Sequence, residues 1–212
     1  MIDIASRVDL AVLKPGSTLD DVERGIILAN KYQVASLCVY PDAVICAVKC
    51  FHNISTVVGF PFGYDVPYIK VEETKWALDQ GVKQIDVVMN LGKFAGGDYR
   101  YVAGELEEIV KICNTYNAVT KVIIETILWP NADVQYACGI VKDSGALFVK
   151  TSTGFIGDGS PPNVAKVQIM LDSGLLVKAS GGIKTREQAE IYLNMGCSRL
   201  GIGFNNLEKV LA

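Results

Sequence analysis

Two lysines interrupt apolar segments of the sequence in the same manner. Lys150 ends the run LFVK, and Lys178 lies within LLVKAS. A lysine is rarely buried unless it is paired or functional. If the two runs are neighbouring strands about 5 Å apart, two like charges repel by roughly 3 kcal/mol at an effective dielectric near 20, which lowers a lysine pKa. The alternative is that one lysine is a solvated residue at a strand end, or that the two side chains point apart.

A lowered lysine pKa matters because only the neutral amine attacks a carbonyl carbon. An ordinary lysine, with a pKa of about 10.4, is neutral in about one molecule in 2,500 at pH 7. A pKa of about 7 raises that fraction about a thousandfold, which corresponds to about 4 kcal/mol. Repulsion between Lys150 and Lys178 supplies most of this shift and desolvation supplies the rest. The pair therefore predicts Schiff-base chemistry.

Three carboxylates lie in similar apolar runs. Asp86 is in QIDVVMN, Asp9 is in VDLAVL, and Glu125 is in IIET. A carboxylate inside an apolar strand is unfavourable unless it is paired or used. Schiff-base chemistry needs groups that move protons, and a carboxylate close to the lysine pair can do this directly or through water. The alternative for Asp86 is a buried structural ion pair with one of the lysines.

Composition excludes several other chemistries. The single histidine, His52, argues against zinc catalysis and against Ser-His-Asp or Cys-His triads. Cys46, Cys50 and His52 are the one conceivable metal cluster, but they read as the end of a helix entering a strand, so no metal is expected. The net charge of -3, without a basic cluster, argues against nucleic acid as a partner. No signal peptide, membrane span or C-x-x-C pair is visible, so a reducing cytoplasmic setting is expected.

These candidate residues need elements to position them, and the chain alternates β-rich runs with amphipathic helical stretches. Runs rich in Val, Ile and Leu are typical of parallel strands that are buried on both faces. Eight such units predict a single α/β domain over 1–212 with a (β/α)₈ barrel fold, and the alternative is an open doubly wound sheet, for which a G-x-G-x-x-G after the first strand is missing. The expected strands are 8–13, 35–40, 55–60, 84–89, 121–126, 146–151, 175–180 and 198–203.

Local signals set some of the helix boundaries. Thr185 is expected as the N-cap and Gly196 as the C-cap of the helix TREQAEIYLNMG. Another helix is expected from Asp133 to Gly145, after Pro130. In a (β/α)₈ barrel the active site lies at the carboxyl ends of the strands, so the polar residues at those ends are the candidates.

Seven segments resemble, in order and over most of the chain, segments of the 2-deoxyribose-5-phosphate aldolase family: VDLAVLKP, LCVYP, VVGFPFG, IDVVMN, KVIIET, FVKTSTGF and VKASGGIKT. The resemblance implies a (β/α)₈ barrel and a class I aldolase without metal or organic cofactor. It implies Lys150 as the Schiff-base lysine, Lys178 as the lysine that lowers its pKa, and Asp86 as the proton-relay acid. The implied reaction is reversible cleavage of 2-deoxy-D-ribose 5-phosphate into D-glyceraldehyde 3-phosphate and acetaldehyde.

The same resemblance implies the residues that bind the substrate. Thr153 is similar to a family residue that hydrogen-bonds substrate hydroxyls. Cys38 is similar to a cysteine near the barrel mouth, although a role as a small buried hydrophobe is favoured for it. Backbone N–H groups of glycine-rich loops are expected to hold phosphate. The full set of expected binding residues is Asp9, Cys38, Thr153, Gly154, Gly181, Gly182, Lys184 and Gly203.

The sequence departs from the family pattern at the end of the eighth run. Gly203 and Phe204 stand where the family usually has hydroxyl side chains, so Asn205 or Asn206 is expected to compensate, or phosphate is expected to bind less tightly. A lost phosphate contact costs about 1–3 kcal/mol of binding. Ala11 replaces the usual threonine of the first motif. The last helix, in LEKVLA, is expected to be short and to lack the family's longer tail.

Other functions stay open at this point. One is a Schiff-base aldolase for different or unphosphorylated aldehydes. Another is a catalytically silent barrel that only binds phosphate, and a third is a barrel isomerase or synthase, for which two lysines at strand ends have no use. The expected partners are a sugar phosphate and small aldehydes, with no nucleic acid and no membrane. Relatives lead us to expect a homo-oligomer, a dimer or larger.

Overall fold

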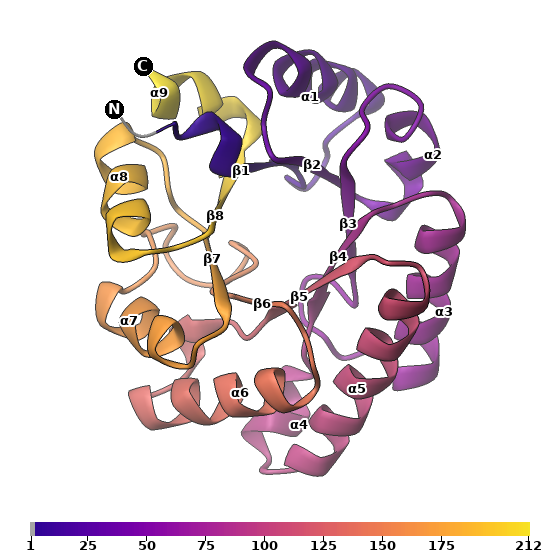
Figure 1. Cartoon of the computed structure of the whole chain (residues 1–212), viewed down its shortest axis with the longest axis vertical. Helices are drawn as coiled ribbons and strands as arrows, with labels where there is room; N and C mark the ends of the chain where they lie inside the picture. The colour runs from indigo at the N-terminus through magenta and orange to yellow at the C-terminus, as the bar shows by residue number, and fades with distance from the viewer. Residues whose placement is uncertain (1–2) are drawn as a thin grey trace.

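Eight parallel strands close into a barrel in the computed structural model, which describes residues 3–212. The strand order follows the sequence, and β8 pairs with β1 to complete the ring (Figure 1). The predicted (β/α)₈ barrel is therefore confirmed, and the open sheet is excluded. The strands are β1 (Val8–Val12), β2 (Ser36–Val39), β3 (Ile54–Val58), β4 (Gln84–Val88), β5 (Val119–Ile123), β6 (Phe148–Lys150), β7 (Leu176–Ser180) and β8 (Arg199–Gly203).

Helices surround the ring of strands on the outside (Figure 1). Side chains alternate along each strand, so one set packs under the helices and the other faces the barrel axis. This explains why every residue of β3 and β4 is buried. The helices are α1 (Leu19–Tyr32), α2 (Val44–Ala47), α3 (Pro67–Asp79), α4 (Leu91–Ala95), α5 (Tyr99–Thr115), α6 (Asn131–Asp143), α7 (Val164–Asp172), α8 (Arg186–Met195) and α9 (Leu207–Leu211).

The predicted helix signals have clear structural counterparts. Thr185 caps α8 through a capping box, and Gly196 ends this helix in the left-handed region at φ 110°. The expected helix after Pro130 begins two residues earlier than Asp133 and ends at Asp143. The last helix, α9, is short, as expected.

The fifth strand differs most from its expected range. It covers Val119–Ile123, whereas the sequence placed it at 121–126. The chain leaves the strand because Glu125 adopts a left-handed conformation, with φ 51° and ψ 62°. Glu125 therefore lies in the loop after β5 rather than in the strand, and its side chain turns toward the loop after β6.

Strand register sets the charged residues opposite one another. Lys150 of β6 is the Cα partner of Lys178 in β7, and Lys178 is the partner of Arg199 in β8. Asp86 of β4 is the partner of Lys121 in β5. All of these positions share one side of the pleat, so their side chains point into the barrel.

Candidate active site

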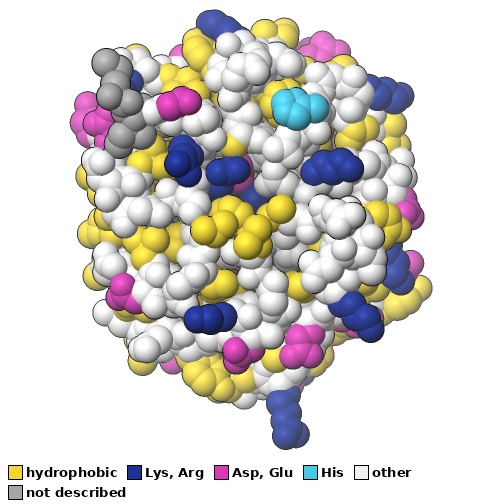
Figure 2. Space-filling view, in the orientation of Figure 1, with side chains coloured by type: hydrophobic (Ala, Val, Ile, Leu, Met, Phe, Trp, Pro, Cys, Tyr) yellow, Lys and Arg dark blue, Asp and Glu magenta, His cyan; other side chains and the backbone are white. Residues whose placement is uncertain are grey.

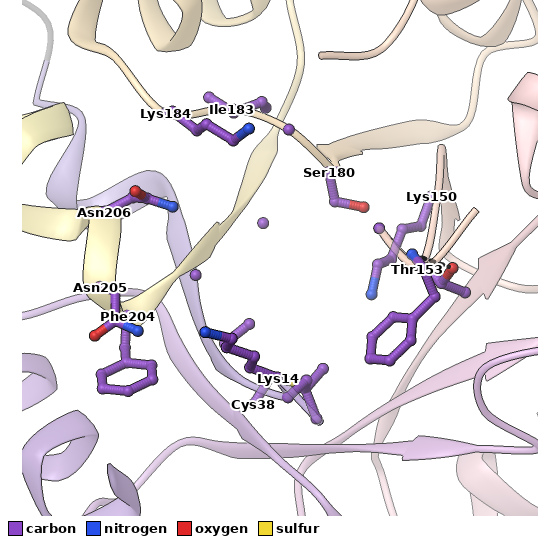
Figure 3. A pocket seen from close by; sticks show the side chains of 18 of the residues that line it. Lys14, Cys38, Lys150, Thr153, Ser180, Ile183, Lys184, Phe204, Asn205 and Asn206 are labelled. Atoms are coloured by element: carbon purple, nitrogen blue, oxygen red, sulfur yellow. Dashed lines mark hydrogen bonds between the residues drawn. The ribbon is translucent and has the colours of Figure 1, made fainter. Parts of the chain in front are cut away.

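A cavity of about 450 Å³ opens where strands β1, β2 and β6 to β8 end. The polar strand-end residues lie where the barrel fold predicts them. Figure 3 shows Lys150 on one side of this cavity and Lys184 with Asn206 on the opposite side. The walls include Ala11, Lys14, Cys38, Lys150, Thr153, Gly154, Phe155, Lys178, Ser180, Gly181, Gly182, Lys184, Gly203, Phe204, Asn205 and Asn206.

Lys150 and Lys178 meet on a single carboxylate oxygen at the bottom of the cavity. The Nζ atoms of both lysines lie 2.7 Å from Oδ2 of Asp86. Lys178 also contacts Oδ2 of Asp9 at 2.6 Å. The two lysines predicted to lie close together are thus brought together, and Asp86 lies between them. This excludes a solvated strand-end position for either one.

Lys121 belongs to the same cluster and is absent from the residues singled out in the sequence. Its Nζ lies 3.0 Å from Oδ1 of Asp86 and 3.1 Å from Oδ2 of Asp9, and its side chain is completely buried. The signal that could have revealed Lys121 is its position in the apolar run KVIIET, where it interrupts β5 as Lys150 interrupts β6. Lys178 and Lys121 each contact both carboxylates, whereas Lys150 contacts Asp86 alone.

The charges in this cluster do not balance when all three lysines are protonated. Asp9 and Asp86 supply two negative charges against three positive ones. Burying an uncompensated charge is unfavourable, so the cluster favours loss of one lysine proton. Lys150 has the fewest carboxylate contacts and lies at the cavity, and it is therefore the lysine that gives up its proton most readily.

The pKa directions agree with this charge balance. Burial lowers the pKa of Lys150 below the ordinary 10.5; Asp86 opposes the change and Lys178 adds to it. Burial also acts to lower the pKa of Lys178, but Asp86 and Asp9 outweigh it, so this pKa is raised. The expectation that repulsion from Lys178 supplies most of the shift on Lys150 was wrong. Burial is the larger cause of the lowered pKa of Lys150.

The carboxylates stay ionised in this environment. Burial acts to raise the pKa of Asp86, but Lys121, Lys150 and Lys178 together hold it well below its ordinary value. Burial opposes ionisation of Asp9 as well, yet Lys121 and Lys178 lower its pKa to about 2. Asp86 therefore stays a charged hydrogen-bond acceptor beside Lys150 at neutral pH.

Asp9 lies beneath the cavity rather than at its wall. It is fully buried behind Lys178, and the described lining residues do not include it. On its other side, Nε of Arg199 lies 3.7 Å from Oδ1 of Asp9. The predicted binding residue Asp9 is thus placed to hold Lys178 and Lys121, and Arg199 carries the cluster on toward the end of the barrel where the strands begin.

Glu125 and Thr153 form a second polar group at the cavity. Thr153 donates two hydrogen bonds to Oε2 of Glu125, from its backbone N–H at 2.9 Å and from its hydroxyl at 2.6 Å. Thr153 lines the cavity beside Lys150, whereas Glu125 is completely buried behind it. Glu125, the third carboxylate named from the sequence, therefore reaches the site through Thr153.

The predicted glycine-rich loops pack backbone against backbone at the wall of the cavity. A side chain at Gly182 would meet the carbonyl oxygen of Ser160, and one at Gly181 would come within 3.5 Å of Cα of Gly154. All three glycines have positive φ, which side chains disfavour. Lys184 and Gly203 lie beside them at the wall. Lys14, from the loop after β1, is a further wall residue that the sequence analysis did not single out.

Cys38 is almost fully buried and its pKa is raised by burial, so its thiol stays protonated although it lines the cavity. Among residues 3–212, no group of three His, Cys, Asp or Glu side chains is arranged to hold a metal ion. Nor does any helix in that range combine the length and apolar character needed to cross a membrane. On the face shown in Figure 2, several Lys and Arg side chains lie close together around the central hollow, and the others are scattered.

No protein-family profile matches the chain, but individual proteins do. A deoxyribose-phosphate aldolase of Treponema denticola is 36% identical over 205 residues, which cover 94% of this chain and 95% of that protein. The structure of QR15, an aldolase, has a TM-score of 0.92 at 33% identity and covers 100% of this chain and 97% of that one.

A further solved structure is that of a deoxyribose phosphate aldolase from Aeropyrum pernix, described as a unique tetramer. It has a TM-score of 0.88 at 30% identity and covers 98% of this chain and 89% of that one. Sequence similarity and barrel geometry agree along almost the whole chain. The chain belongs to the deoxyribose-phosphate aldolase family.

Proposed function

We propose that this protein is a lyase that reversibly cleaves 2-deoxy-D-ribose 5-phosphate into D-glyceraldehyde 3-phosphate and acetaldehyde. The observation that carries the proposal is Lys150, a buried amine with a lowered pKa that opens onto the cavity beside Asp86. A neutral amine in this position is a nucleophile for an aldehyde. The names of the related proteins point to the same substrate.

In the first stage, Nζ of Lys150 attacks C1 of the open-chain sugar. The C1–N bond forms, the carbonyl oxygen takes a proton, and the resulting carbinolamine loses water to give an iminium ion. Asp86 and Lys178 are the candidates for moving these protons. Oδ2 of Asp86 lies 2.7 Å from Nζ of Lys150 and 2.7 Å from Nζ of Lys178. Asp86 accepts and returns protons, directly or through a water molecule.

In the second stage, the iminium ion accepts the electrons of the breaking bond. The hydroxyl on C3 loses its proton and becomes a carbonyl, while the C2–C3 electron pair forms the enamine of acetaldehyde on Lys150. Glyceraldehyde 3-phosphate is released. Protonation of the enamine at C2 and hydrolysis then free acetaldehyde and restore the amine, so atoms and charges balance over the cycle.

The side of the cavity away from Lys150 fits the phosphate group. Gly154, Gly181 and Gly182 line the cavity, and their backbone N–H groups are our candidates for binding the anion, with Lys184 adding a positive charge. Lys14 supplies a second exposed ammonium group at the same cavity. These cations offset the hydroxyl donors that are missing at Gly203.

One observation favours a second candidate, a Schiff-base aldolase for unphosphorylated aldehydes. The ring of Phe204 is buried under the guanidinium of Arg24 and brings no hydroxyl to a phosphate, and Gly203 has no side chain. The rate with deoxyribose 5-phosphate against that with deoxyribose separates the two candidates. A rate that does not depend on the phosphate favours the second.

Borohydride trapping tests the proposed chemistry. The protein is incubated with deoxyribose 5-phosphate, reduced, and mapped by peptide mass spectrometry. We expect one adduct on Lys150, its loss in Lys150→Ala, and its retention in the matched control Lys49→Ala, which changes an exposed lysine. Absence of an adduct with this sugar and with acetaldehyde alone would overturn the aldolase proposal and favour a barrel that only binds phosphate.

We also infer that the protein acts as a homo-oligomer in the cytoplasm, in the catabolism of deoxyribose phosphate. The tetramer described for the Aeropyrum pernix relative supports an assembly of two or more copies. All six cysteines are free, which is typical of a reducing compartment. Light scattering at several protein concentrations measures the assembly, and a monomer at all concentrations would contradict it.

A further inference from the structure

Glu125 occupies a costly position that the Schiff-base chemistry does not use. Its backbone is left-handed at φ 51° and its side chain is completely buried. Such a conformation is unfavourable for a residue other than glycine and persists where surrounding contacts require it. The contacts are with the neighbouring loop: after Glu125, Thr126 donates its N–H to the carbonyl of Thr151 at 2.8 Å.

Within residues 3–212, the carboxylate of Glu125 has no positively charged partner. None of the ion pairs among residues 3–212 includes Glu125. Its Oε1 atom is buried and has no hydrogen-bond partner in the same range. A buried carboxylate without a cation is unfavourable for stability. We therefore look for the role of Glu125 in the two hydrogen bonds that its Oε2 atom accepts from Thr153.

These contacts fix the hydrogen-bonding polarity of the Thr153 hydroxyl. A threonine hydroxyl has one proton and two lone pairs. The proton is donated to Glu125 at 2.6 Å, and one lone pair accepts the N–H of Phe155 at 3.1 Å. One lone pair is left for the cavity that Thr153 lines. Toward a substrate, this hydroxyl can accept a hydrogen bond but cannot donate one.

An acceptor of this kind distinguishes the oxygen atoms of the substrate, if the proposed function holds. The oxygen on C3 alternates between hydroxyl and carbonyl during the reaction, and a carbonyl cannot donate to Thr153. The oxygen on C4 remains a hydroxyl in the sugar and in glyceraldehyde 3-phosphate, where it is on the carbon next to the aldehyde. Only this second hydroxyl can keep its hydrogen bond to Thr153 in both directions.

We propose that Glu125 is a positioning residue that makes Thr153 an acceptor-only hydroxyl, and that the site thereby selects aldehydes with a hydroxyl on the adjacent carbon. The proposal rests on the proposed aldolase function and assigns the specificity of that site. It gives Glu125 a role that requires a hydrogen-bond acceptor at Oε2 and does not require proton transfer to Glu125.

The test uses two aldehydes of equal size with acetaldehyde as the enamine donor. Glycolaldehyde carries the adjacent hydroxyl and propanal has a methyl group in its place. We expect the wild-type kcat/KM, corrected for aldehyde hydration, to favour glycolaldehyde by about tenfold, the usual effect of one hydrogen bond. Thr153→Val is expected to bring this ratio to about one, because the hydroxyl of glycolaldehyde loses its acceptor.

The control Thr115→Val makes the same change at an exposed threonine on α5 and should leave the ratio unchanged. Thr153→Ser retains the hydroxyl and should retain the ratio. A Thr153→Val variant that still favours glycolaldehyde as strongly as the wild type would overturn the proposal.

Variants of Glu125 separate positioning from proton transfer. Glu125→Gln keeps an acceptor oxygen and should keep the ratio and kcat within about threefold of the wild type, whereas Glu125→Leu should lose the ratio. The double variant Glu125→Leu, Thr153→Val should have the same ratio as Thr153→Val alone, because Glu125 acts through Thr153. Loss of kcat in Glu125→Gln with both aldehydes would overturn a positioning role.

The outcome is distinguishable from a failure of the proposed function. Borohydride trapping of acetaldehyde on Lys150 reports Schiff-base formation and involves no acceptor aldehyde. We expect this adduct in the wild type, in Thr153→Val and in Glu125→Gln. Adduct formation with an unchanged aldehyde preference in Thr153→Val would reject the role of Glu125 and leave the aldolase function standing.

Discussion

At the scale of the residue, three buried lysines share the negative charge of two carboxylates. Lys178 and Lys121 each contact both Asp9 and Asp86, and Lys150 contacts Asp86 alone. The same carboxylates that keep Lys178 charged leave too little negative charge for Lys150. Removing either of the other lysines should therefore return negative charge to Lys150 and raise its pKa.

The pH dependence of the reaction measures this effect. The neutral fraction of Lys150 rises as pH rises through its pKa, which lies below the ordinary 10.5. We expect kcat/KM to reach its plateau at a lower pH in the wild type than in Lys178→Met or Lys121→Met, by about one pH unit for each 1.4 kcal/mol of lost interaction. Lys49→Met is the exposed control. Unchanged profiles in both variants would contradict a role of these charges in tuning Lys150.

The chemistry-bearing residues were predictable where they interrupt a pattern. Lys150, Lys178 and Asp86 interrupt apolar runs, and the structure places them within 2.7 Å contacts. Lys121 is the first residue of the run expected at 121–126, a position common for exposed residues, so its charge inside the barrel was not predicted. Arg199 begins its strand, a position common for exposed residues, so nothing local marks its approach to Asp9.

At the scale of the element, strand identity was predictable and strand ends were less so. Eight runs rich in branched residues were recognised because strands buried on both faces leave no polar alternation. The end of β5 was misplaced because Glu125 leaves the strand to reach Thr153, a contact between loops that no local sequence signal encodes. The conformations of the loops after β6 and β7 also depend on a contact between loops, in which the backbones of Gly154 and Gly181 approach each other closely.

Gly182 offers a test of these loops. Gly182→Ala would bring a methyl group against the carbonyl of Ser160 at a positive φ of 70° and displace the loop. Gly81→Ala is the matched control, because Gly81 has φ 94° and open space around it. We expect Gly182→Ala to raise KM for deoxyribose 5-phosphate about tenfold or more through lost phosphate contacts, with little change for deoxyribose. Equal KM changes for both sugars would contradict a phosphate role for this loop.

At the scale of the whole molecule, the ionic cluster forms only when the barrel is closed. Its residues come from β1, β4, β5, β6 and β7, and Asp9 meets Lys178 and Lys121 across the interior. Fold class could be predicted because the count of strands and helices allows few closed arrangements. The contacts of Asp9 with Lys121 and Lys178 across the barrel axis could not be predicted, because they depend on the strand register around the complete ring.

If residues 1–212 form one domain, as predicted, the protein should unfold in a single cooperative transition. Trp76 on α3 and Trp129 after β5 report fluorescence from one half of the ring, and circular dichroism reports all helices. We expect both signals to change at the same urea concentration, as for a two-state domain. Two separated transitions would contradict the single-domain prediction.

The surplus positive charge in the cluster has a consequence later in the catalytic cycle. An iminium nitrogen on Lys150 carries a positive charge as long as it keeps its proton, and it lies beside the same Asp86, Lys178 and Lys121. The cluster that disfavours an ammonium group at this position also disfavours the iminium ion. Formation of the neutral enamine removes that repulsion. The cluster therefore favours transfer of the C2–C3 electron pair to the iminium ion and shortens the lifetime of this cationic intermediate.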